Sequence, residues 1–403
     1  MSLQGARILV ADDQLDVART LTQPLRAAGA TLHVAGDGEQ ALRAIQSGGL
    51  DLALVDMKMP PDDWGGLWLL EELQRRRIAL PCLVLSGEGQ QRQTIAAMNF
   101  DAKGWISKSH ADTELLVRST EQLELALGSA VDTMTATGPG PLAHSYARYR
   151  RHMGGDLQYF EGLRLIEEVI RFVTLIGFAC TSFEGNSPLR GVRPEAFTKP
   201  SFGTWATALR ELASLADRDS PFAPLAHSLT ADGGTVIQVV NKLRNDHVHA
   251  GVDPAPEDRR QVQRVVDSWG HRLTLAPFII GSHAQMQFVN DALQVTIREY
   301  RGAFPPKTAR LTLREKEILG TEPHLFVEGH PPVRLTPWFR TIDTAMSGES
   351  KVAIYDGAKA RNPRRPEDDD SLTYTDPSTG ERGKLISSPT STWGDIAPWF
   401  KDG

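Results

Sequence analysis

Five side chains suited to acid, base or phosphate chemistry follow short apolar runs in the first third of the chain. Asp12 and Asp13 follow the first run, and Asp56, Ser86 and Lys108 follow later ones. Helical stretches separate these runs, and an alternation of strand and helix predicts a parallel α/β sheet. Because parallel strands present their carboxyl ends at one edge of the sheet, we expect these five side chains to share one crevice.

The residue types in this predicted crevice indicate which ligand it would hold. Asp12, Asp13 and Asp56 would repel one another at close range unless a dication lay between them. Mg²⁺ prefers oxygen ligands and keeps coordination positions for water and phosphoryl oxygens. The ammonium group of Lys108 and the hydroxyl of Ser86 would contact the same phosphoryl group. These residues therefore predict a magnesium-dependent phosphate site.

The motifs ILVADDQ, LALVDMKMP, LVLSG and GWISK together resemble the CheY-like receiver domain of two-component response regulators, from about Arg7 to Leu127. The resemblance implies a doubly wound parallel sheet of five strands, with Asp56 as the phosphoacceptor and a sensor histidine kinase as the partner. It implies Mg²⁺ as the cofactor, held by Asp12, Asp13, Asp56 and the backbone carbonyl of Lys58. Lys108 would bridge Asp56 and the phosphoryl group.

The same resemblance implies a switch and a limited catalytic role. Ser86 would bond the phosphoryl oxygen, and Trp105 would follow it inward. The receiver would catalyse only its own phosphotransfer and dephosphorylation, by carboxylate attack on phosphorus. Two positions depart from the family pattern: Trp64 lies in a longer loop after the phosphoacceptor, and Ser109 replaces a proline. The alternative is a nucleotide-binding or degenerate sheet whose acidic residues only cap strand ends.

Size and composition exclude several classes of protein. A chain of 403 residues predicts two or three domains. A net charge of −6 and a pI near 6.0 disfavour DNA as a partner, and no helix-turn-helix with a basic recognition helix is evident. No apolar run reaches the roughly 20 residues of a membrane span, and no export signal is evident. We therefore expect a cytoplasmic protein that does not associate with membranes.

Changes in composition along the chain predict its domain boundaries. We expect the receiver at residues 1–127 and a linker at residues 128–143, where small residues, glycine and proline predominate. Apolar residues at three- and four-residue steps predict an all-α bundle at residues 144–283. Short alternating runs predict a small antiparallel β domain, a barrel or curled sheet, at residues 284–403.

A second chemical motif lies in the predicted bundle, within the segment LRNDHVHAG. Arg244 and Asn245 are followed by His247 and His249, which concentrates a fixed cation and two imidazoles on about one helical turn. The motif and its all-helical setting resemble the HEPN superfamily, which includes metal-independent ribonucleases. The resemblance implies that Arg244 and His249 are catalytic, that Asn245 is the polar residue after the arginine, and that two copies meet in a homodimer acting on RNA.

Other interpretations of this motif stay open. Arg244 could pair with an acidic neighbour such as Asp246 or Asp217, while His249 caps the helix and His247 is structural. The bundle would then be an inert dimerisation or recruitment module, or would bind a nucleotide-like ligand. Our hypothesis is a response regulator whose phosphorylation controls a HEPN-like endoribonuclease. The alternative is a non-catalytic regulator whose helical and β domains mediate dimerisation and recruit a protein partner.

Overall fold

The computed structural model describes most of the chain in two compact units. The described residues are 3–87, 91–181, 189–217, 219–249, 253–276, 278–289, 292–313, 319–343, 350–359 and 371–379. The first unit comprises Met1–Ala130 and Asp267–Pro277, and the second comprises Val131–Val266 and Phe278–Gly403. Within the described residues, we find no helix with the length and apolar character that crossing a membrane requires.

The first unit contains a parallel five-stranded sheet with the order β2-β1-β3-β4-β5. Its strands are β1 (Arg7–Ala11), β2 (Thr31–Ala35), β3 (Leu52–Asp56), β4 (Cys82–Ser86) and β5 (Gly104–Ser107). Every residue of β1 and β3 is buried, as expected for central strands that are covered on both faces. From β1 the chain continues to β2 on one side of the sheet and then to β3 on the other side. This change of side places a ligand crevice at the carboxyl ends of β1 and β3.

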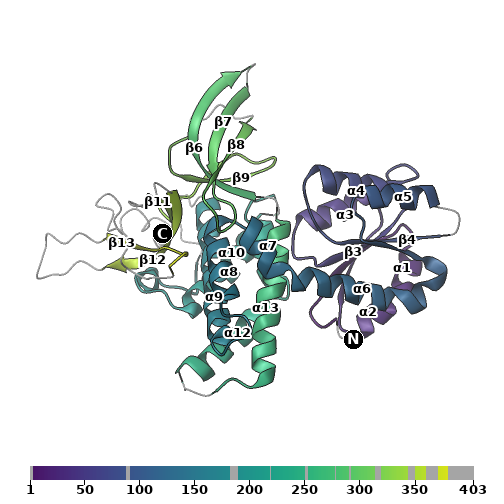
Figure 1. Ribbon diagram of the computed structural model, residues 1–403, viewed down its shortest axis with the longest axis horizontal. Helices are drawn as coiled ribbons and strands as arrows, with labels where there is room; N and C mark the ends of the chain where they lie inside the picture. Colours follow the sequence, from purple (N-terminus) through teal and green to yellow (C-terminus); the bar gives the residue numbers. More distant parts are fainter. Residues whose placement is uncertain are drawn as a thin grey trace, which may run out of the picture. The chain divides into compact units, whose positions relative to one another are not determined.

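Helices cover both faces of this sheet (Figure 1). One face packs against α3 (Gly38–Gln46), α4 (Gly65–Arg75) and α5 (Gln91–Asn99), and the other against α1 (Leu15–Leu21), α2 (Gln23–Ala27) and α6 (Ala111–Gly128). Each face has its own cluster of buried aliphatic side chains. The predicted doubly wound parallel fold is confirmed.

The last turns of α13 (Pro256–Leu275) belong to the first unit, although sequence analysis assigned this whole helix to the bundle. Arg272 donates from Nε and Nη2 to the carboxylate of Asp51, at 2.8 and 2.7 Å. Nε2 of His271 lies 3.0 Å from the Asp51 carbonyl oxygen, and Leu275 packs against one of the two cores of the first unit. Asp51 precedes β3, at the end of the sheet opposite the ligand crevice.

The segment expected to be a linker, residues 128–143, is helical instead. It contains α7 (Ala130–Thr137) and the start of α8 (Gly140–Arg150). The glycines and prolines at 138–141 mark the junction between these helices, and Pro141 lies in the first turn of α8, where a missing N–H costs nothing. Leu142, Tyr146 and Tyr149 are buried at helical spacing along α8.

A buried helix organises the second unit. This helix, α9 (Gln158–Cys180), packs against α8, α10 (Phe202–Leu215) and α11 (Ala223–Thr230), and α12 (Thr235–Arg244) contacts α10 and α11. A π-helical turn, Asn245–His249, follows α12. The helical bundle expected in this region is therefore present, but its start lies within the segment we expected to be a linker.

The β-rich part forms two antiparallel sheets rather than a single barrel or curled sheet. One has the order β10-β9-β6-β7-β8 and the other β11-β12-β13 (Figure 1). The strands are β6 (Phe278–Val289), β7 (Ala292–Glu299), β8 (Lys307–Leu313), β9 (Pro323–Val327), β10 (Val333–Arg334), β11 (Phe339–Asp343), β12 (Ser350–Lys359) and β13 (Ser371–Thr375). The smaller sheet is anchored to the helices: Trp338 stacks on Phe178 at 4.9 Å, and the Tyr355 hydroxyl donates to the Phe197 carbonyl. This attachment gives the smaller sheet a core that three strands alone would lack.

Candidate phosphoacceptor site

Three carboxylates meet at the carboxyl ends of β1 and β3. Asp12 and Asp13 follow β1 directly, and Asp56 is the last residue of β3. One oxygen from each residue lies within 4.8 Å of the others. Asp12 and Asp56 are buried, with 0% and 3% of their surface exposed, whereas Asp13 is exposed. A group of oxygen donors with one member facing solvent suits a hard divalent cation that keeps some of its water.

Lys108 supplies the positive charge that the crevice needs. It follows β5, and its Nζ lies 2.8 Å from Oδ2 of Asp12 and 3.0 Å from Oδ2 of Asp56. The backbone N–H of Gln14 donates to the other oxygen of Asp12, at 2.9 Å. These contacts orient two of the three carboxylates, because each is held by charge or by a hydrogen bond.

Burial and charge shift the protonation equilibria of this site in opposite ways. Burial raises the pKa of Asp56 above its ordinary value, and nearby Asp12 adds to this, while Lys108 and a hydrogen bond from the backbone of Lys58 lower it only in part. Burial also opposes the charge on Lys108, but the carboxylates of Asp12 and Asp56 outweigh it, so the pKa of Lys108 is raised. One ammonium group does not neutralise the three acidic groups, which leaves room electrostatically for a dication.

The loop after Asp56 is closely packed against the strand that carries it. Gly66, in the first turn of α4, lies so close that an added Cβ would be 2.2 Å from the Asp56 carbonyl oxygen. At Gly65 an added Cβ would be 2.1 Å from the carbonyl oxygen of Pro60. Trp64, one of the departures from the family pattern, packs against the core beside α4. Glycine is therefore required here for close backbone approach.

The remaining predicted receiver residues lie at the expected places along the chain. Ser86 ends β4, but its side chain lies outside the described part of the structure. Trp105 lies in β5 and is 43% exposed. Ser109 belongs to a short 3₁₀ helix, where its hydroxyl lies 2.7 Å from that of Ser107. The serine that replaces the family's proline thus takes part in a local cap.

The first part of the chain matches known receivers. Residues 8–120 match the family model described as "Response regulator receiver domain". The N-terminal part of this protein is therefore a response regulator receiver domain, of the type named CheY-like.

Among curated proteins, the chain is 35% identical over 114 residues to "Response regulator MprA" of Mycobacterium ulcerans, covering 28% of this chain and 48% of that protein. It is 29% identical over 116 residues to "Transcriptional regulatory protein TcrA" of Mycobacterium tuberculosis, covering 29% and 45%. The chain thus spans about half the length of these relatives.

Two solved structures also match. The response regulator TrrA from Thermotoga maritima, in complex with Mg(2+)-BeF, is 26% identical and covers 29% of this chain and 98% of its own, with a TM-score of 0.27. The receiver domain of NtrX from Brucella abortus is 28% identical and covers 29% and 98%, with a TM-score of 0.28.

The Arg244 motif lies in the second unit and is engaged in intramolecular contacts. Nη2 of Arg244 lies 3.3 Å from Oε2 of Glu167 on α9, and its guanidinium lies over the Phe202 ring, 5.9 Å from the centroid. Sequence analysis proposed other acidic partners, Asp246 or Asp217. Glu167 was missed because it lies far away in the sequence, on a helix whose burial only the fold reveals.

The two histidines of this motif differ in how they are placed. His247 is buried, with Nε2 3.3 Å from Oδ2 of Asp258 and its ring edge-on to Tyr159. The side chain of His249 lies outside the described part of the structure, whereas Asn245 is exposed. Arg244 and His247 therefore both pair with acidic side chains of this chain.

Proposed function

We propose that Asp56 is the phosphoacceptor of a signalling receiver and that a sensor histidine kinase is its phosphodonor. The observation that carries this proposal is the group of three carboxylates within 4.8 Å, with Lys108 held against two of them, in a segment that matches the receiver family. The Asp56 carboxylate would attack the phosphorus of a phosphohistidine on the kinase, so that a P–O bond forms while the P–N bond breaks and the imidazole leaves. Lys108 would hold the transferred group by a charge-assisted contact.

The donor set also fits a magnesium ion. Asp12, Asp13, Asp56 and the carbonyl of Lys58 would hold it, and when bound it would neutralise charge on the phosphoryl oxygens. In this proposal Ser86 bonds the phosphorylated carboxylate and Trp105 changes its packing in response. Both residues lie on strands that end at the same edge of the sheet as Asp56.

The phosphoacceptor is tested by incubating the full-length chain with labelled acetyl phosphate and Mg²⁺. We expect Asp56→Asn to abolish the uptake of label, because an amide does not form the acyl phosphate. Asp112→Asn is the matched control, since Asp112 is an exposed aspartate on α6 of the same unit. Undiminished labelling of Asp56→Asn would place the phosphoacceptor elsewhere.

For the output, the geometry best supports a helical module that mediates dimerisation and partner recruitment. A guanidinium that holds a buried carboxylate and covers an aromatic ring is less available to clamp a phosphate. His247, buried against Asp258, is placed as a packing residue. In this proposal phosphorylation of the receiver changes the homodimer formed by the chain.

A HEPN-like ribonuclease is the second candidate output, and one observation favours it. Asn245–His249 form a π-helical turn directly after Arg244, and such turns often occur at functional sites. Arg244, Asn245 and His249 would then act on RNA as a composite site in a dimer. The matched relatives include a protein named as a transcriptional regulator, so DNA also stays an open partner class, although sequence analysis disfavoured it.

One experiment separates these outputs. The full-length chain is incubated with total RNA, with and without acetyl phosphate, beside Arg244→Ala, His249→Ala and the control Lys242→Ala, an exposed residue of α12. Absence of cleavage with a phosphorylation-dependent mass change in light scattering supports the recruitment module. Cleavage that both Arg244→Ala and His249→Ala abolish would refute it, and a strict monomer in both states would exclude either dimeric output.

A further inference from the structure

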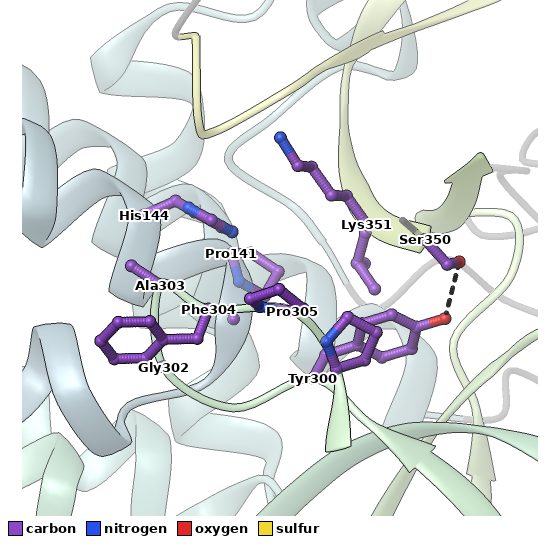
Figure 2. Close-up of a pocket in the computed structure, with 12 residues that line it drawn as sticks. Pro141, His144, Tyr300, Gly302, Ala303, Phe304, Pro305, Ser350 and Lys351 are labelled. Carbon is purple, nitrogen blue, oxygen red and sulfur yellow. Dashed lines mark hydrogen bonds between the residues drawn. The ribbon is translucent and has the colours of Figure 1, made fainter. Parts of the chain in front are cut away.

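The second unit contains a pocket of about 170 Å³ that none of the functions discussed above uses. Three segments distant in the sequence line it: the start of α8 from Gly140 to His144, the segment after β7 from Tyr300 to Pro306, and the start of β12 from Ser350 to Val352. Figure 2 shows Lys351 and His144 at one side of this pocket and the rings of Phe304 and Tyr300 at the other.

The polar side of the pocket is rich in hydrogen-bond donors. An ammonium group has three donors, and among the described residues Lys351 directs one of them to Oγ of Ser378, at 3.2 Å. The hydroxyl of Tyr300 lies 2.9 Å from that of Ser282 and 3.1 Å from that of Ser350. Two hydrogen bonds thus link these three hydroxyls and use two of their three O–H donors, whereas Lys351 keeps two of its three.

The charge of the lining points to the sign of the ligand. Among the described residues that line the pocket, Lys351 is a fixed cation and none is acidic. An anion is therefore favoured over a cation or a neutral molecule, because a buried or half-buried charge needs an opposite partner.

The remaining lining is apolar and limits the size of the ligand. Phe304, the prolines at positions 141, 305 and 306, and Val352 form the apolar walls. Pockets for drug-sized ligands are usually about 300 to 1,000 Å³, whereas a cavity of about 150 Å³ holds a benzene ring. The pocket is thus of a size for a single ring with one polar substituent.

We propose that this pocket binds a small organic monoanion: a carboxylate on a compact, ring-sized apolar body. The carboxylate accepts from the Lys351 ammonium group. The apolar body packs against Phe304 and the prolines. This site is separate from the phosphoacceptor and makes the second unit a ligand-binding module.

The proposal is tested by equilibrium dialysis of the full-length chain against labelled benzoate as the probe. We expect saturable binding with a dissociation constant in the millimolar range or tighter. Benzamide, which has the same shape but no charge, should compete at least about tenfold more weakly, because a charge-assisted contact is lost. Inorganic phosphate should compete weakly as well, since it has no apolar body.

Two variants address the two halves of the pocket. Lys351→Met keeps the apolar stem and should weaken benzoate binding about tenfold or more. Phe304→Ala should weaken it about threefold to tenfold through lost ring contacts. The matched controls are Lys242→Met, on α12, and Phe288→Ala, because Phe288 is 58% exposed, as is Phe304.

Four outcomes would overturn the proposal. The first is the absence of saturable benzoate binding. The second is competition by benzamide as strong as by benzoate itself, which removes the role of the anion. The third is competition by phosphate as strong as by benzoate, which removes the role of the apolar walls. The fourth is unchanged binding in both Lys351→Met and Phe304→Ala, which places the benzoate elsewhere.

Discussion

A single methyl group at Gly66 should disturb the proposed phosphoacceptor site without touching any of its carboxylate or ammonium groups. A Cβ at this position would lie 2.2 Å from the carbonyl oxygen of Asp56 and 2.8 Å from Cα of Met57. Both are backbone atoms at the end of β3, where Asp56 lies, so no side-chain rotation relieves the clash. Either the start of α4 or the end of β3 must move by several tenths of an ångström or more.

The net effect on stability is a difference between two terms. Overpacking of a well-packed site costs about 1 to 3 kcal/mol. Alanine in place of glycine within a helix returns about 0.5 to 1 kcal/mol. We therefore expect Gly66→Ala to lower the free energy of unfolding by up to about 2.5 kcal/mol. Because a misplacement of about 1 Å can cost up to about a hundredfold in rate, labelling by acetyl phosphate should slow at least about tenfold.

Urea unfolding and the initial rate of labelling measure the two effects. Gly128→Ala is the matched control, because Gly128 is also helical and an added Cβ there meets nothing within 4 Å. That control should label like the wild type and be as stable or slightly more stable. If Gly66→Ala were as stable and as readily labelled as Gly128→Ala, the steric reasoning would be refuted.

Three further predictions concern buried charge in the first unit. Arg272→Met should lower the free energy of unfolding by about 3 to 5 kcal/mol in urea titrations, because it leaves the buried Asp51 carboxylate without its counter-ion. Combining Arg272→Met with Asp51→Asn should recover part of this loss, because the unpaired charge is then removed. Burial lowers the pKa of His271, so on acidification the unfolded chain binds a proton at this residue before the folded chain does. The free energy of unfolding should therefore fall as the pH falls from about 6.5 toward the folded-state pKa. Urea titrations at several pH values should show a less steep fall in His271→Gln. An equal slope in both proteins would contradict this. Lys108→Met should lower the melting temperature measured by thermal unfolding. Added Mg²⁺ should raise this temperature more steeply in the variant than in the wild type, because the ion replaces the lost charge between Asp12 and Asp56. No effect of Mg²⁺ on the melting temperature would count against the metal site.

Local sequence patterns predicted the strand ends of the first unit correctly, but they did not predict the first helices of the second unit or the pairing of its strands. The strand ends at Asp56 and Lys108 were readable because each follows a short apolar run, and the topology of a parallel sheet brings such ends together. The helical structure of residues 130–143 was missed because the glycines and prolines at 138–141 conceal the apolar spacing on either side. The two antiparallel sheets were taken for one because alternation identifies a strand but not its partner.

By itself, the sequence determined the class of the first domain and the residues of its acidic crevice, since each apolar run and the polar residue that ends it are neighbours in the sequence. Only the tertiary structure decided that the last turns of α13 belong with the receiver and that Arg244 pairs with Glu167. The Arg272–Asp51 pair joins residues 221 positions apart in the chain. Such contacts depend on how whole elements pack, and a charge pattern does not specify which of many distant partners a side chain will meet.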